Sequence, residues 1–228
     1  MILNINKHRG VSSFNIVKSI RYITKEKRVG HGGTLDPFAE GVLIVGTGKD
    51  TKKLTNITNE DKSYLATIKL GFATNTLDTY GKIFKEKKVP NLDRKIISKI
   101  LLSFLGSTMQ TPPMFSAKKI AGKKLYELAR MGTPVTKEPR EINIYDIEIM
   151  EQSFPKYSFK ISCSKGTYIR SLARDIGTGL GIGCHLSKLQ RLSQGDFRIS
   201  DAKDVNNVEM SDLIHIKDAF KGYEKLML

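Results

Sequence analysis

One short segment brings together residue types that could act on a flat ligand. Residues 30–37 read GHGGTLDP, with a histidine between glycines and an aspartate five residues later. Glycine has no Cβ and lets the backbone approach a planar ligand closely. The loop can therefore present the imidazole of His31 and the carboxylate of Asp36 to one cavity. The alternative is a turn that Asp36 caps before Pro37, with His31 at the surface.

Two other glycine-containing segments fail as nucleotide-binding motifs. The glycines of residues 177–183 close a predicted helix, whereas a dinucleotide fingerprint follows a strand and opens a helix. Residues 46–49 (GTGK) resemble part of a phosphate-binding loop. Leu43 stands where the first glycine belongs, and Asp50 replaces the Ser or Thr that holds magnesium. Neither segment predicts a nucleotide site.

The charge of the chain favours a polyanionic partner. Its 228 residues carry a formal net charge of +15, although residues 196–228 hold five basic and seven acidic residues. Such an excess points to nucleic acid. The alternative is a lysine-rich solvated surface from a compositionally biased proteome.

The remaining composition predicts a reduced compartment. Cys163 and Cys184 form no CxxC pair, and zinc-ligand spacing is absent, so we expect free thiols and no metal. No stretch reaches the ~20 apolar residues of a membrane span, and the N-terminus lacks a signal-peptide pattern. We therefore expect a cytoplasmic protein.

Periodicity predicts helices and strands in mixed order. A helix begins at Ser12 or Ser13 with Phe14, Val17 and Ile20 inward, and others are predicted over residues 93–105, 122–132 and 168–180. Strands are predicted over residues 42–45, 64–70, 142–149 with a bulge near Asp146, and 157–163. The fold class is thus α+β, with a mixed, largely antiparallel sheet flanked by helices.

One main domain accounts for most of the chain. We expect it to span residues 1–200, with a basic insertion at about 108–140 that projects from the sheet. Residues 201–228 are expected to form a short helical tail.

Six further blocks, together with residues 30–41 (GHGGTLDPFAEG), resemble the tRNA pseudouridine-55 synthase (TruB) family. The blocks occur in family order. They are residues 7–13 (KHRGVSS, with His8 where proline is usual), 61–64 (DKSY), 71–81 (GFATNTLDTYG), 110–132 (QTPPMFSAKKIAGKKLYELARMG), 163–180 (CSKGTYIRSLARDIGTGL) and 189–197 (LQRLSQGDF).

The resemblance implies the pseudouridine synthase fold and its reaction. Uridine 55 in the T-loop of tRNA becomes pseudouridine through base flipping, cleavage of the glycosidic bond and formation of a C–C bond. No cofactor is expected, since no net redox change occurs. The implied partner is the T-arm of tRNA. We expect a monomer with no membrane association and no obligate protein partner.

The same resemblance assigns roles around the target base. Asp36 is implied as the catalytic carboxylate, either as a nucleophile or as a group that stabilises and deprotonates the ribose. Arg170 is its implied ion-pair partner. Tyr64 is expected to stack on the uracil, Tyr168 to line the pocket and His31 to support the flipped base. Core packing is the alternative for both tyrosines, a surface phosphate contact for Arg170 and loop packing for His31.

Basic residues are implied to contact the RNA. Lys7 and Lys62 are expected at phosphate or at the rim of the site, with a solvated surface as the alternative. The residues expected along the RNA backbone are Lys52, Lys118, Lys119, Lys123, Lys124 and Arg130.

The resemblance also leaves alternatives open. Bacterial relatives continue into a PUA domain, and we expect this chain to lack it. A pseudouridine synthase for another RNA, a tRNA-folding chaperone and a basic RNA-binding protein without chemistry are the competing readings.

Overall fold

The computed structural model describes residues 1–90, 94–116, 119–120, 123–124, 138–205 and 208. The chain forms two compact units, one of residues 1–62 and 190–228 and the other of residues 63–189. The chain passes from one unit to the other at the start of strand β4 (Lys62–Leu70) and within strand β12 (Cys184–Gln194).

The first unit is built on the strand order β14-β1-β3-β12, with β2 paired to β3 and β13 paired to β12. Strands β1 and β3 are antiparallel, whereas β14 and β12 run parallel to their neighbours β1 and β3. The elements are β1 (Ile2–Lys7), α1 (Ser13–Thr24), β2 (Val29–His31), β3 (Glu40–Thr47), η1 (Gly48–Lys53), α2 (Leu54–Asn59), β13 (Phe197–Arg198), η2 (Ile199–Asp201) and β14 (Lys203–Asp204).

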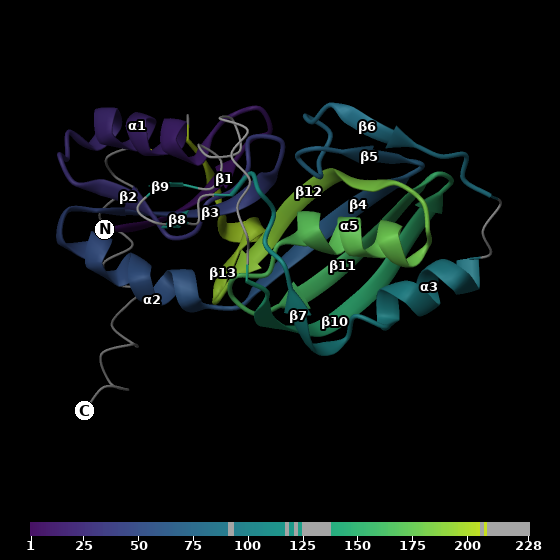
Figure 1. Cartoon of the computed structure of the whole chain (residues 1–228). Helices are drawn as coiled ribbons and strands as arrows, with labels where there is room; N and C mark the ends of the chain where they lie inside the picture. The colour runs from purple at the N-terminus through teal and green to yellow at the C-terminus, as the bar shows by residue number, and fades with distance from the viewer. Residues whose placement is uncertain (91–93, 117–118, 121–122, 125–137, 206–207, 209–228) are drawn as a thin grey trace. The chain divides into compact units, whose positions relative to one another are not determined.

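Strand β3 is the centre of the core in this unit. Its residues 41–47 are all buried, which requires cover on both faces. One face contributes Val42 and Ile44 to a cluster with Leu54 and Ile57 of α2. Figure 1 shows α1 and α2 on opposite sides of β2 and β3.

Helix α1 begins where the sequence predicts. The Ser12 side chain caps it by accepting a hydrogen bond from the Asn15 amide (3.1 Å). The predicted inward positions Val17 and Ile20 are buried, but Phe14 is 56% exposed, so its inward assignment was wrong. The buried face is made by positions three and four residues apart: Ser13, Ile16, Val17, Ile20 and Thr24.

The second unit has the strand order β12-β4-β11-β10-β7, in which β10 runs antiparallel to both β11 and β7. Figure 1 shows α5 over β11, with α3 beside it near the end of β10. Besides β4 and β12 the elements are β5 (Phe72–Thr74), β6 (Ile83–Glu86), α3 (Arg94–Leu102), β7 (Gly106–Gln110), β8 (Lys119–Ile120), β9 (Lys123–Lys124), β10 (Arg140–Ser153), β11 (Lys156–Cys163) and α5 (Ile169–Gly179).

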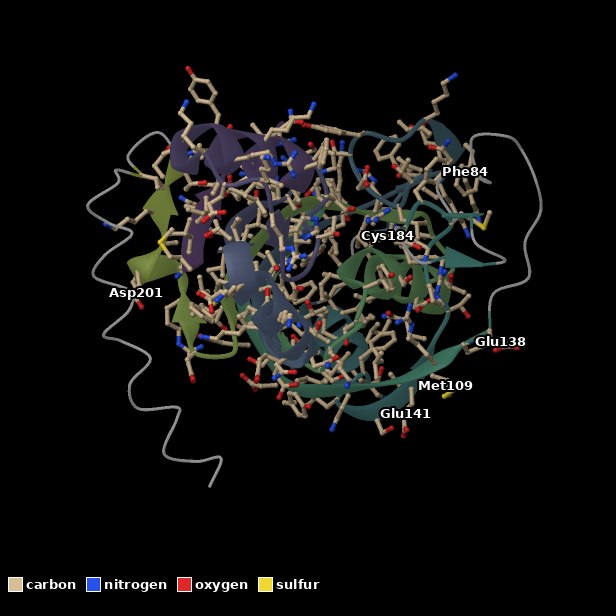
Figure 2. All side chains as sticks on the ribbon, turned by 90° about the vertical axis from the view of Figure 1, so that its left-hand side faces the viewer. Phe84, Met109, Glu138, Glu141, Cys184 and Asp201 are labelled. Carbon is tan, nitrogen blue, oxygen red and sulfur yellow. The ribbon has the colours of Figure 1, made fainter. Side chains whose placement is uncertain are left out.

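Strand and helix periodicities in this unit match the sequence. Alternate residues of β11, from Tyr157 to Cys163, are buried, and the strand register of β10 shifts between Ile144 and Asp146, as predicted for a bulge. Helix α5 buries its predicted inward face. The edge of the sheet at β7 meets solvent. There Met109 of β7 pairs with Glu141 of β10, and the two side chains lie side by side at the surface (Figure 2).

Three boundaries differ from the sequence prediction. Helix α3 ends at Leu102, and Gly106 (φ 90°) begins β7 instead of terminating the helix. Lys203 and Asp204, expected in a helical tail, form strand β14 because their backbone pairs with β1. Lys123 and Lys124, expected in a helix over residues 122–132, pair with Lys119 and Ile120 as two short strands. The rest of that helix and of the tail lies outside the described residues.

The expected insertion leaves the sheet at a defined point. Gln110 at the end of β7 pairs with Arg140 at the start of β10. The intervening segment therefore starts and ends at neighbouring positions, close to the predicted bounds of 108–140.

Candidate active site

In the first unit, Asp36 lies in the connection between β2 and β3. The Asp36 side chain is partly exposed, and its carbonyl accepts a hydrogen bond from the Ala39 amide (3.0 Å), which closes a tight turn around Pro37. The carbonyl of Pro37 accepts from the Gly10 amide (2.7 Å). The aspartate therefore sits on a loop that two backbone hydrogen bonds already constrain.

Ser13 of α1 fixes the residue before Asp36. Its buried hydroxyl donates to the Leu35 carbonyl and accepts from the Leu35 amide, both at 2.9 Å. One side chain thereby satisfies both polar groups of one loop residue, and buried backbone groups need such partners. The start of α1 thus sets the position of the backbone that carries Asp36.

Two buried side chains of β12 hold the glycine-rich part of the loop. Arg191, 2% exposed, donates to the carbonyl of Thr34 (3.0 Å), the carbonyl of Gly33 (3.3 Å) and the amide oxygen of Gln194 (2.7 Å). Gln194 donates in turn to the carbonyls of Gly32 (2.5 Å) and Ile57 (2.7 Å). Arginine suits this task because its planar fork offers several donors in fixed directions.

Close backbone packing brings β12 into reach. Gly41 of β3 pairs with Arg191, and a Cβ at Gly41 would lie 2.3 Å from the Arg191 carbonyl oxygen. The φ of Gly41 is +102°, a region that favours glycine. Glycine at position 41 therefore permits the contact that places Arg191 under the loop.

Lys7 completes the support from β1, and its expected place at phosphate or at the rim of the site stays a prediction. Its side chain is 0% exposed, and its Nζ donates to the carbonyls of Ala39 (2.5 Å), Val11 (2.7 Å) and His8 (3.1 Å). Burial lowers the pKa of Lys7 to about 8, against the opposing attraction of Asp36 and Glu40. At neutral pH its charge is present and favours the ionised form of Asp36.

His31, at the end of β2, is half-buried beside this support. Its Nδ1 is buried and has no hydrogen-bond partner among the residues that the structure describes. Burial, and secondarily the charge of Arg191, lower the pKa of His31 below its usual value. The imidazole is therefore neutral at pH 7. Its expected role beside a flipped base stays a prediction.

In the second unit, Arg170 of α5 is held from three directions. It is 4% exposed and donates to the carbonyls of Phe115 (2.8 Å) and Thr76 (2.9 Å), and its Nη1 lies 3.8 Å from the carboxylate of Asp78. The Asp78 carboxylate accepts from the Thr76 hydroxyl (2.7 Å) and the Tyr80 amide (2.9 Å). Burial argues against a surface phosphate contact for Arg170. Its pairing with Asp36 stays a prediction.

Tyr168, which precedes α5, is fixed through its backbone. The buried side chain of Gln110 accepts from the Tyr168 amide (2.8 Å) and donates to the Tyr168 carbonyl (3.1 Å). The guanidinium of Arg140 lies over the Tyr168 ring, 5.3 Å from its centroid. The Gln110 side chain thus binds both backbone groups of Tyr168, just as the Ser13 hydroxyl binds both backbone groups of Leu35.

Tyr64 lies on β4, 6% exposed, on the same face as the buried Ala66 and Ile68. This position suits both a core residue and one wall of a base pocket, so stacking on uracil stays a prediction. Lys62 precedes it on the same face and is 9% exposed. Its Nζ donates to the carbonyls of Thr58 (3.0 Å) and of Glu60, which follows α2. Its expected place at phosphate or at the rim of the site stays a prediction.

The expected contacts of these basic residues with the RNA backbone stay predictions. Lys52 is exposed on η1. Lys119, Lys123 and Lys124 are described only as members of β8 and β9. Lys118 and Arg130 lie outside the described residues.

Sequence reasoning missed the side chains that hold the site. Ser13 was assigned to helix capping, and no role was given to Gln110, Asp78, Arg191 or Gln194, although all five fall inside or at the edge of the family-like blocks. A signal was present in the buried strands, since a polar residue in such a strand must have partners. Which partners it has depends on the fold.

Two kinds of feature are absent from the residues that the structure describes. No helix among them is long and apolar enough to cross a membrane. No group of three His, Cys, Asp or Glu side chains in the same set is placed to hold a metal ion.

Comparison with known proteins identifies the fold and the family. The structure aligns with a chain of a Cbf5-Nop10-Gar1 complex at a TM-score of 0.68 and 29% identity, over 96% of this chain and 55% of that one. Residues 21–169 match the model of the TruB family pseudouridylate synthase N-terminal domain. "tRNA pseudouridine synthase B" of Clostridium tetani is 42% identical over 99% of this chain and 79% of its own length. The protein of that name from Francisella philomiragia is 44% identical over 91% of this chain and 69% of its own length.

The fold is thus that of a pseudouridine synthase, as the sequence predicted. This protein covers little more than half the length of the chain in the solved complex, but most of the length of the two bacterial relatives. The chain belongs to the TruB family of pseudouridylate synthases.

Proposed function

We propose that this chain isomerises uridine 55 in the T-loop of tRNA to pseudouridine. The observation that carries the proposal is the support of the Asp36 loop by four buried side chains, Lys7, Ser13, Arg191 and Gln194. A loop that only connected two strands would not require so many buried polar groups, each costly unless paired. Relatives named tRNA pseudouridine synthase B, at 42–44% identity, indicate the substrate class.

The chemistry needs an ionised carboxylate beside the sugar–base bond. The bond between C1′ and N1 breaks, the uracil turns, C1′ bonds to C5, and the proton of C5 leaves while N1 gains one. Asp36 acts as nucleophile or as the base at the ribose, and either role requires the charged form. The buried charge of Lys7 favours that form electrostatically.

The other assignments follow the family and are part of the proposal. Tyr64 stacks on the uracil, Tyr168 lines the pocket, and His31 supports the flipped nucleotide. Arg170 serves as the cation for the reacting carboxylate. Flipping costs a few kcal/mol of unstacking, which such contacts must offset.

The test compares Asp36→Asn with Asp201→Asn. Asp201 is an exposed carboxylate of the same unit, with a single hydrogen bond from Ser200 (2.9 Å) (Figure 2). Each protein is incubated with an unmodified tRNA transcript, and pseudouridine is mapped at nucleotide resolution while RNA affinity is measured. We expect Asp201→Asn to form product like the unaltered chain, and Asp36→Asn to bind RNA and form none. Product from Asp36→Asn at the unaltered rate would refute the role of Asp36.

A second candidate function is modification of another RNA. The chain also aligns, at a TM-score of 0.64 and 26% identity, with a chain of an H/ACA RNP that was solved with a substrate RNA. Mapping total cellular RNA after incubation with the protein separates the candidates. Product confined to non-tRNA sites would refute the tRNA assignment.

A further inference from the structure

Helix α1 carries an outward face of aromatic and basic residues. The outer face of α1 consists of Phe14, Lys18, Arg21, Tyr22 and the C-cap residue Lys25. Spacings of three and four residues place them along one side of the helix. The helix contains no Asp or Glu. The face is therefore a continuous basic stripe.

Two of its cations are held by exposed rings. The Lys18 ammonium lies 5.0 Å from the centroid of Phe14, and that of Lys25 lies 4.3 Å from the centroid of Tyr22. The rings are 56% and 76% exposed. Exposed aromatic side chains gain little from the hydrophobic effect, so packing of the core does not explain them. They restrict the two lysines and so reduce the entropy lost when each lysine binds an anion.

Glu26 follows Lys25 in the chain, but the cations of this stripe form no ion pair among the described residues. Among the residues that the structure describes, no carboxylate lies within ion-pair distance of Lys18, Arg21 or Lys25. Exposed lysines elsewhere do pair, as Lys53 does with Asp50 (3.0 Å) and Lys160 with Glu148 (3.1 Å). Among the described residues, the outer face of α1 is thus open to an anionic partner, and Lys18 and Tyr22 also line a hollow with Val205 and Val208.

The stripe starts at the candidate site. Ser13, the first residue of α1, binds both backbone groups of Leu35, next to Asp36. From there the 12 residues of α1 extend for about 18 Å. A nucleic-acid strand with one nucleotide at Asp36 could continue along this length, and its phosphates would meet the cations.

We propose that the outer face of α1 binds the phosphate backbone of the RNA strand next to the target nucleotide. The inference rests on the proposed function, because it takes RNA as the substrate. Phe14 and Tyr22 act as positioning residues for Lys18 and Lys25. Contacts to phosphate release counterions and make affinity depend on salt, without reading sequence.

The test uses the double variant Lys18→Gln/Lys25→Gln in the full chain. The matched control is Lys156→Gln/Lys188→Gln, which removes two exposed lysines from β11 and β12 of the other unit. The equilibrium Kd for an unmodified tRNA transcript is measured between 50 mM and about 200 mM salt. Single-turnover product formation is measured at saturating RNA.

We expect the test variant to raise Kd about tenfold and to lower the log–log salt slope by roughly 1 to 2, relative to the control. The single-turnover rate should match that of the control, because the support of Asp36 is untouched. Phe14→Leu/Tyr22→Leu keeps both charges, so it should raise Kd by less and leave the slope nearly unchanged.

Equal Kd values and slopes for test and control variants would overturn the inference. A loss of thermal stability in the test variant with unchanged Kd would overturn it as well, because the face would then pack against the chain itself. If the unaltered protein makes no pseudouridine, the proposed function fails. The Kd and the salt slope still report on α1 in that case.

Discussion

Replacing Arg191 with methionine removes hydrogen bonds that support the Asp36 loop and leaves the Asp36 carboxylate itself unchanged. Arg191→Met keeps much of the side-chain volume and removes the fork that binds Gly33, Thr34 and Gln194. Arg191 is 2% exposed, so the change should not alter a surface that meets RNA. The variant therefore tests whether buried hydrogen bonds set the geometry at Asp36.

The structure gives the size of the effect. The change leaves two backbone carbonyls and one side-chain amide oxygen without their donor, at about 1–3 kcal/mol for each buried group. Partial relaxation and water entry reduce the sum, so we expect a loss of about 3–5 kcal/mol in the free energy of unfolding. A shift of the loop by about 1 Å would lower the rate by about 100-fold.

Denaturant unfolding and single-turnover pseudouridine formation measure the two effects. Arg198→Met is the control, since Arg198 is exposed in the same unit and donates one hydrogen bond, to Gly195 (3.1 Å). RNA affinity should be the same in both variants. Arg191→Lys retains the charge but not the fork, and should recover stability more than rate. The reasoning is refuted if Arg191→Met remains folded and reacts as fast as Arg198→Met.

Two further predictions concern glycine packing and protonation. Gly41→Ala would place its Cβ 2.3 Å from a backbone oxygen of β12, so we expect this variant to lose folding or activity. Gly179 in α5 has open space around it, so Gly179→Ala should keep both. Thermal unfolding and product formation measure the two effects. In the folded chain the pKa of Lys7 is lowered from 10.5 to about 8. Between these pH values the unfolded chain holds the Lys7 proton more tightly than the folded chain does. The contribution of Lys7 to the free energy of unfolding therefore rises with pH across that window, by up to about 3 kcal/mol. Denaturant unfolding of Lys7→Met and the unaltered chain at pH 7 and pH 10 checks the sign, which is wrong if the stability difference between the two proteins shrinks at high pH.

Local pattern predicted much of the fold. Strict alternation from Tyr157 to Cys163 identified β11, and the apolar spacing of α5 identified its buried face. The apolar spacing failed in α1, where it did not identify which side of the helix faces the core. Phe14 has helical spacing to Val17, but the core meets the side defined by Ile16 and Ile20. Lys203 and Asp204 have no strand pattern and pair with β1 through backbone groups alone.

For the candidate site, the sequence predicts the catalytic residue but missed the side chains that support its loop. Asp36 was recognisable from its glycine-rich context and family-like blocks. Lys7 and Lys62 were predicted at phosphate or at the rim of the site, because the sequence does not show that a lysine is buried. In the structure both ammonium groups bind backbone carbonyls. Burial, which decides between these roles, is a property of the packed chain.

By itself, the sequence determined the fold class, the family and the identity of the one carboxylate on which the proposed reaction depends. These follow from residue types and spacings, which are local and can be read along the chain. Only the tertiary structure decided that Ser13, Gln194 and Arg191 hold the loop around Asp36, across as many as 162 residues of sequence. A hydrogen bond depends on where two groups lie in space, and that placement exists only after distant strands have packed together.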